Sequence, residues 1–112
     1  MLNSYNFTKK DEINSISATP LQKVKGQVLH VVGAAITMRL DEETGEEKKV
    51  GLIATDQGTF SSISGTAIKG LDGIIDYMID LQEDDNTPVT IDIKVNAAKS
   101  NAGREFITLE IV

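Results

Sequence analysis

Hydrophobic and polar side chains alternate most regularly near the carboxyl end of the chain. Apolar side chains stand mostly at every second position in two runs, residues 88–95, PVTIDIKV, and residues 104–112, REFITLEIV. This period of two is typical of a β-strand with one buried face and one solvent-exposed face. The residues 96–103 between the two runs end in glycine, which favours a turn. The pattern therefore predicts a β-hairpin.

A helical pattern precedes this hairpin. Residues 66–82, TAIKGLDGIIDYMIDLQ, carry apolar side chains three or four positions apart, as an amphipathic helix does. The apolar stripe contains Ala67, Ile68, Leu71, Ile74, Ile75, Met78 and Leu81. Ser64 or Thr66 is expected to cap the helix, and Pro88 prevents it from continuing. We therefore expect one helix, about 25 Å long, packed on a sheet.

The region before the helix is apolar on both faces of its predicted strands. Residues 21–40 predict a long central strand, in which Gly26 and Gly33 allow a bend or a bulge. The acidic residues 41–49, DEETGEEKK, are expected to form a hairpin loop that returns the chain antiparallel. Two shorter strands follow, at residues 50–55 and 59–64, with a turn at DQG between them.

The predicted order is three strands, one helix and two strands. Five antiparallel strands are typical of the OB-fold, a small and partly open barrel. We therefore expect a mainly β protein with one helix, an OB-like five-stranded antiparallel barrel with the helix between strands 3 and 4, over residues 21–112. Residues 1–20 show no sustained period, so we expect an N-terminal arm, partly disordered, that offers a site for self-association.

Length and composition narrow the functional classes. A chain of 112 residues corresponds to one domain, and the absence of cysteine excludes disulfide bonds and thiolate metal sites. No segment is apolar for long enough to span a bilayer, so we expect no membrane association. The net charge of −6 argues against nucleic-acid binding, because phosphate contacts require lysine or arginine. However, the acidic residues concentrate in segments 41–47 and 72–85, which leaves other surfaces basic.

Two aromatic residues are candidates for contact with nucleic acid. The alternation places Phe60 and Phe106 on the solvent side of strands whose other side is apolar. Exposed aromatic rings on a small sheet can stack with the bases of a single strand. The alternative is a strand phase shifted by one residue, which would place both rings in the core. The pattern alone leaves both interpretations open.

Basic residues accompany the predicted strands. Those outside the acidic segments include Lys23, Lys25, Lys94, Lys99 and Arg104. Arg104 shares the strand phase of Phe106, so it can hold a phosphate or stack on a base beside that ring. The alternative for these cations is a solvated face or a protected sheet edge, where lysine is common. We expect the cations to follow the backbone of a bound single strand.

Three segments carry a family resemblance: the run GLIATDQGTFSSISGTAIKGLDGIIDYMIDL, the turn KSNAG and the final strand EFITLEIV. Together they resemble the single-stranded-DNA-binding proteins of small tailed phages that replicate by protein priming. The resemblance covers residues 21–112. It implies an OB-like fold and sequence-independent binding of displaced strands during replication, with no catalysis, cofactor or metal. It also implies a protein of the infected host cytoplasm that works beside replication proteins such as the phage DNA polymerase. Phe60 and Phe106 match aromatic positions of that family, whose members stack bases on tyrosines.

Other functions have weaker support. His30, the only histidine, lies in an apolar run, so we expect a core or half-buried side chain rather than a catalytic one. No nucleophile–base pair or cofactor motif is present, so we do not expect an enzyme. The rival function is an acidic OB-like protein-interaction module, an inhibitor of a host protein or an assembly subunit that does not bind DNA. Its support is the net charge and the acidic helix face with Asp72, Asp76 and Asp80.

Overall fold

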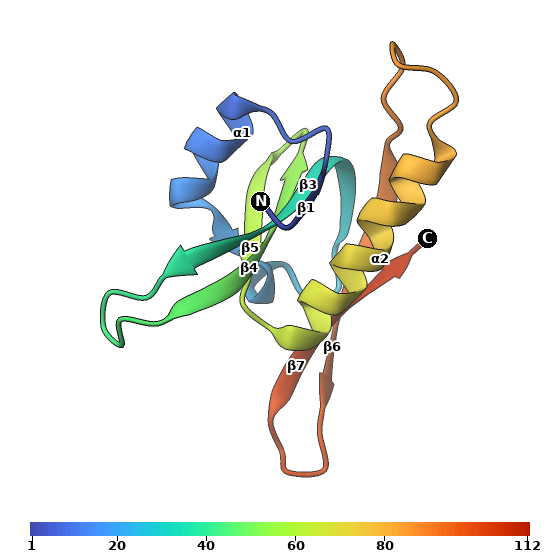
Figure 1. Ribbon diagram of the computed structural model, residues 1–112. Helices are drawn as coiled ribbons and strands as arrows, with labels where there is room; N and C mark the ends of the chain where they lie inside the picture. The colour runs from blue at the N-terminus through green and yellow to red at the C-terminus, as the bar shows by residue number, and fades with distance from the viewer.

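A curled sheet and one long helix make up most of the fold in the computed structural model, which describes residues 1–112 (Figure 1). The strands are β1 (Asn3–Tyr5), β2 (Thr19–Pro20), β3 (Val28–Leu40), β4 (Glu47–Thr55), β5 (Gly58–Ser62), β6 (Ile91–Lys99) and β7 (Glu105–Ile111). The helices are α1 (Lys9–Asn14) and α2 (Gly65–Leu81), with 3-10 turns at Ser15–Ser17 and Leu21–Val24. The sheet order is β2-β5-β4-β3-β6-β7, and β1 also pairs with β3. The sheet curls strongly into a half-barrel, and the expectation of a mainly β protein is confirmed.

The long strand β3 holds the sheet together because it pairs along both edges. One edge pairs with β4, while the other pairs first with β6, from Val28 to Val31, and then with β1, from Ala34 to Ile36. A β-bulge lies between Val31 and Gly33, as the glycine predicts. Because a bulge inserts one residue, it changes which side chains face the core on its two sides.

The central strand begins later than residue 21, where the apolar pattern predicts it. Residues Leu21–Val24 form a 3-10 turn that buries Leu21 in the core. Gly26 then adopts a φ of +80°, a left-handed conformation that interrupts an extended chain. The strand therefore starts only at Val28.

The sheet is neither closed nor wholly antiparallel. β5 and β7 stand at opposite sides of the curl and do not pair with each other. The outer edge of β5 pairs instead with β2, in parallel, through Thr19 and Pro20. The arm thus supplies an edge partner that the five-strand prediction lacks.

Helix α2 lies on the core side of the sheet, and its bounds agree with the predicted helix within one residue. Its predicted apolar stripe is buried from Ala67 to Met78. The predicted capping bond is not formed: Ser64 is the N-cap residue, but its side chain makes no cap hydrogen bond. The Thr66 hydroxyl instead donates to the backbone oxygen of Ile107 at 2.7 Å, which ties the helix to β7. No helix of the chain combines the length and apolar character that a membrane crossing requires.

The first residues of the chain anchor the arm in the core. Tyr5 is buried, and its hydroxyl donates to Gln82 Oε1 at 2.5 Å and accepts from the backbone N–H of Val89 at 2.7 Å. The chain then crosses β3 at Gly33, where a Cβ would lie 2.4 Å from the backbone oxygen of Asn6. Only a glycine allows so close a backbone approach.

After this crossing, the arm covers the outer side of β3 and β4. Phe7 packs against a small apolar cluster made by Ala35, Val50 and Leu52. Arg39 of β3 donates to the Ser15 hydroxyl at 2.6 Å, which fixes the end of the arm helix against the sheet. Figure 1 shows α1 beside this part of the sheet. The second part of β3 and the adjoining part of β4 are therefore covered on both faces.

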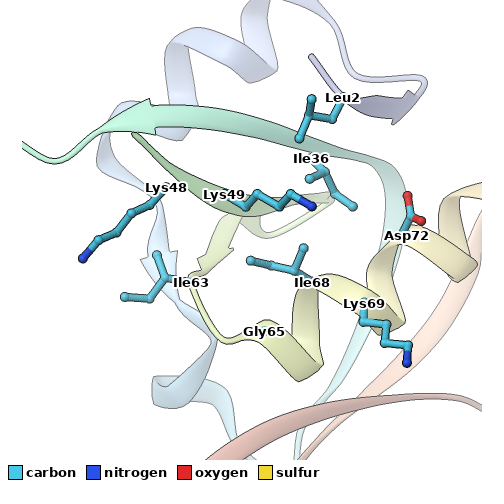
Figure 2. A pocket seen from close by; sticks show the side chains of 9 residues that line it. All are labelled: Leu2, Ile36, Lys48, Lys49, Ile63, Gly65, Ile68, Lys69 and Asp72. Carbon is cyan, nitrogen blue, oxygen red and sulfur yellow. The ribbon is translucent and has the colours of Figure 1, made fainter. Parts of the chain in front are cut away.

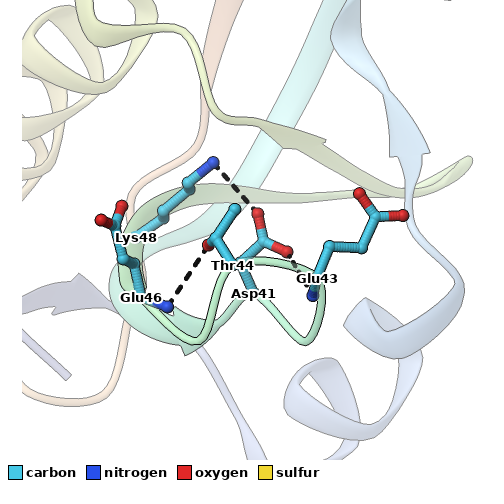
Figure 3. A network of polar contacts seen from close by, with 5 residues as sticks. All are labelled: Asp41, Glu43, Thr44, Glu46 and Lys48. Atoms are coloured by element: carbon cyan, nitrogen blue, oxygen red, sulfur yellow. Dashed lines mark hydrogen bonds and ion pairs between the residues drawn. The ribbon is translucent and has the colours of Figure 1, made fainter.

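The turn between β3 and β4 is held by its own side chains (Figure 3). The Lys48 ammonium lies 3.0 Å from the Asp41 carboxylate, which also accepts the backbone N–H of Glu43 at 3.0 Å. The Thr44 hydroxyl accepts the backbone N–H of Glu46 at 3.3 Å. The hydrogen bond from Lys48 is the main reason why the pKa of Asp41 lies below its ordinary value of 3.8. Local pairing thus orders this acidic turn.

Candidate nucleic-acid interface

One face of the sheet is open to solvent where β6 pairs with β7 and with the first residues of β3. We name this surface the bare face. Its side chains are all exposed or half-buried and belong to Val28, His30, Asp92, Lys94, Asn96, Ala98, Phe106, Thr108 and Glu110. The register places Val28 beside Lys94 and Asn96 beside Thr108, so the face continues across three strands. The opposite side of the same strands is buried in the core at Ile93 and Ile107.

Phe106 lies on the bare face, on the side of β7 that the alternation predicts. The residue is half-buried, while its neighbour Ile107 is buried on the opposite side of the strand. Directly opposite Phe106 on β6 stands Ala98, whose small side chain covers little of a neighbouring ring. A partly exposed ring on a sheet face is a suitable surface for stacking of a base.

The prediction that Phe60 is exposed is wrong. Phe60 is only 8% exposed and packs in the core, paired across the strands with Ile53 of β4. In the sequence, Ile63 is the large apolar residue whose phase suggests a buried face opposite Phe60, but β5 ends at Ser62, and Ile63 is 74% exposed. Because successive side chains alternate between faces, a phase set from a residue outside the strand puts Phe60 on the wrong side.

The end of the β6–β7 hairpin gathers three predicted cations. Lys99 ends β6 and Arg104 precedes β7; both are exposed and have neither a side-chain hydrogen bond nor an ion pair. Lys25 reaches the same end, where its ammonium lies 2.8 Å from the Glu105 carboxylate. Glu105 is also the residue opposite Lys99 in the strand register, but its carboxylate forms an ion pair with Lys25 alone, so one carboxylate lies among three cations. The hairpin end is therefore locally positive in a chain of net negative charge.

The other two predicted cations lie apart from the hairpin end. Lys94 is half-buried on the bare face, opposite Glu110, which accepts a hydrogen bond from Asn96 at 3.4 Å. Lys23 is exposed in the 3-10 turn that precedes Lys25. The structure therefore brings most of the predicted side chains to one hairpin and its open face, and it separates Phe60 from them.

The bare face also contains residues that the sequence analysis missed or misplaced. His30 is exposed, so the expectation of a core or half-buried histidine is wrong; its Nδ1 lies 2.8 Å from the Asp92 carboxylate. Asn96 continues the polar phase of β6, and that alternation could have indicated it. Val28 is apolar but 54% exposed, and only its register with Lys94 places it here.

The acidic face of α2 is separated from the bare face by the sheet. The helix lies on the core side of β7, where a Cβ on Gly70 would lie 3.9 Å from the Cβ of Leu109. Two of the helix carboxylates, on Asp72 and Asp76, accept hydrogen bonds from the Asn3 amide at 2.8 and 3.2 Å. The helix carboxylates therefore do not face a strand bound on the bare face.

One family model matches this chain in the comparison with known proteins. The model of the family described as phage single-stranded DNA-binding protein matches residues 11–112. No curated protein and no solved structure is similar enough to the chain to count as a match. The match spans nearly the whole chain, including every strand of the bare face, and it confirms the resemblance seen in the sequence. The chain therefore belongs to the family of phage single-stranded DNA-binding proteins.

Proposed function

We propose that this protein coats displaced single strands during phage DNA replication, without catalysis and without preference for base sequence. Bases stack on Phe106, and phosphates contact the cations Lys23, Lys25, Lys94, Lys99 and Arg104. The observation that carries the proposal is the partial exposure of Phe106 on the bare face, next to a hairpin end with unpaired cations. Such coating protects the strand from nucleases and hinders renaturation.

The chemistry of this surface favours binding that tolerates any sequence. Every base has a flat aromatic face, so stacking on Phe106 does not distinguish one base from another, and it contributes about 1–3 kcal/mol per base. Phosphate contacts carry no sequence information. With one aromatic ring on the face and a net charge of −6, we expect weak binding per protomer, offset by cooperative coverage of the strand.

We further infer that β3, β4, β5, β6 and β7 correspond to the five strands of an OB-like barrel. Their order in the sheet, β5-β4-β3-β6-β7, and the place of α2 between β5 and β6 support this correspondence. The division into an arm, residues 1–20, and a binding domain, residues 21–112, belongs to the same proposal. The same proposal includes that the protein acts in the host cytoplasm beside the phage DNA polymerase and that it self-associates through the arm.

Fluorescence anisotropy with a labelled oligo-dT tests the proposal. With about four to six phosphate contacts, the logarithm of the affinity is expected to fall with the logarithm of salt concentration at a slope of roughly −3 to −4. Duplex of the same length should bind much more weakly, since its bases cannot stack on Phe106. Absence of binding at micromolar protein, or equal binding of duplex, would contradict the proposal and favour an acidic protein-interaction module.

A further inference from the structure

A cavity of about 620 Å³ lies between the base of the β3–β4 hairpin and the first turns of α2 (Figure 2). Its walls are apolar at Ile36 and Ile68, and Ile63 stands at its rim. Three lysines, Lys48, Lys49 and Lys69, also line it. Concave sites of this size, with apolar walls and a few polar groups, are typical of sites that hold small organic groups.

The cations of this cavity are largely unpaired. Lys49 and Lys69 are exposed and make neither a side-chain hydrogen bond nor an ion pair, whereas Lys48 is held by Asp41 at 3.0 Å. The one carboxylate at the rim, on Asp72, accepts a hydrogen bond from Asn3 at 2.8 Å. In a chain of net charge −6, two lysines without partners at the border of an apolar cavity favour an anionic ligand with an apolar part.

The apolar rim supports the same conclusion. Ile63 is 74% exposed and Leu2, on the opposite wall, is 57% exposed. Large aliphatic side chains that remain exposed together around a hollow mark a contact surface more often than isolated exposed residues do. Figure 2 shows Ile63 and Ile68 on one side of the cavity, and Leu2 and Ile36 on the other. The flat face of a nucleobase would cover these side chains.

The cavity continues toward the hairpin end with the predicted cations. Ile63 also lines a second hollow of about 490 Å³, which runs along Ser61–Ser64 and reaches Glu105. Glu105 is the residue that pairs with Lys25 at the end of the β6–β7 hairpin. This second hollow lies between the end of β5 and the start of β7, and Pro20, Leu21 and Gln22 form the rest of its wall. Ile63 therefore borders both hollows, one that reaches Glu105 at the hairpin end and one that Lys49 and Lys69 line.

We propose that the first cavity is a nucleotide subsite of the bound single strand. The strand leaves the bare face over the β6–β7 hairpin end and follows the gap between β5 and β7. It then inserts one base beside Ile63 and Ile68, and its phosphates contact Lys49 and Lys69. This inference rests on the proposed function and extends it to a second section of the surface. It assigns DNA contacts to residues of β4 and α2, which carry none of the predicted site residues.

A matched pair of double variants tests this subsite with oligo-dT. Lys49→Ala with Lys69→Ala should lower the affinity and reduce the salt slope by about 1.4, since each phosphate contact on a single strand contributes about 0.7. The control, Lys9→Ala with Lys10→Ala in α1, removes the same charge from exposed arm residues away from the cavity and should leave the slope unchanged. An unchanged slope in the cavity variant, or an equal fall in both variants, would overturn the subsite.

Nuclear magnetic resonance of isoleucine methyl groups locates the base without any substitution. On titration with oligo-dT, the Ile63 and Ile68 methyl signals should shift, while those of the exposed Ile13 on α1 and Ile79 on α2 should not. If the wild-type chain binds oligo-dT but the Ile63 and Ile68 signals stay in place, the subsite is wrong and the proposed function stands. If the wild-type chain does not bind, the proposed function itself fails.

Discussion

The two halves of the curled sheet differ in how many faces of their strands are covered. In the half formed by β4 and the second part of β3, the arm covers one face and the core covers the other. Val50, Leu52 and Ala54 are therefore buried even though they point away from the core side of β4. In the half formed by β6, β7 and the start of β3, buried and accessible side chains alternate, and one face remains bare.

This difference shows where the molecule can hold a ligand. Where a strand is covered on both faces, as β4 is from Val50 to Ala54, it contributes stability but presents no side chains to a partner. Only the uncovered start of β4, with Lys48 and Lys49, is accessible. A strand with one open face can present a ring such as Phe106 without loss of its core contacts through Ile107. Phe60 lies on β5, which pairs with β4 of the covered half, and Phe106 lies on β7 of the half with the bare face. The contrast between these two residues is therefore the sharpest test of the comparison.

The largest effect is expected for Phe60→Ala. Phe60 packs in the core, and truncation of a buried phenylalanine lowers the free energy of unfolding by about 3–5 kcal/mol. Chemical denaturation measures this loss, and Phe106→Ala should cost much less because that residue is only half-buried. Equal losses in the two variants would show that the two halves of the sheet do not differ in the way described.

A smaller loss of stability is expected for Gly33→Ala, at the point where the arm crosses β3. The added Cβ would lie 2.4 Å from the backbone oxygen of Asn6, and forced overpacking of this kind costs about 1–3 kcal/mol. The measurement is thermal unfolding together with proteolysis of the arm, which should become easier. Gly73→Ala is the matched control: its Cβ meets open space, and replacing a helical glycine should stabilise the fold by up to about 1 kcal/mol.

Phe106→Ala should weaken DNA binding while it leaves the fold nearly intact. Loss of one stacked base corresponds to about 1–3 kcal/mol, or roughly a 5- to 150-fold rise in the dissociation constant for oligo-dT. Tyr77→Ala provides the control, since Tyr77 is an exposed aromatic residue on the acidic helix α2. Wild-type affinity in the Phe106 variant, or an equal loss in the Tyr77 variant, would remove the ring from the interface.

The smallest effect concerns the turns of the two halves. The β3–β4 turn pairs its own charges, whereas the β6–β7 turn leaves Lys99 and Arg104 unpaired. Lys48→Ala should raise the pKa of Asp41 toward 3.8, because the hydrogen bond from Lys48 is the main cause of the lowered value. A carboxyl with a lowered pKa stabilises the fold above pH 3.8, and that contribution is lost as the pH falls below it. Carbon-13 titration of the Asp41 carboxyl measures the shift, and an unchanged pKa would contradict the pairing.

The parts of the fold that could be predicted are those with a long local period. Helix α2 and the β6–β7 hairpin each repeat their pattern over many residues, so a single exception does not change the assignment. β5 has only five residues, and one misleading apolar side chain, Ile63, reverses the assignment of its faces. For this reason the predicted strand face is confirmed for Phe106 and wrong for Phe60.

The amino-acid pattern by itself determined the helix, the strands around it, the family resemblance and the side of β7 on which Phe106 lies. Only the tertiary structure decided that the arm covers β4, that the sheet stays open between β5 and β7, and that lysines from β4 and α2 line one cavity. The physical reason is that periodicity records burial within one element, whereas these features depend on contacts between residues far apart in the chain. Burial of Val50 and Leu52 looks the same in the sequence whether the arm or the core covers them.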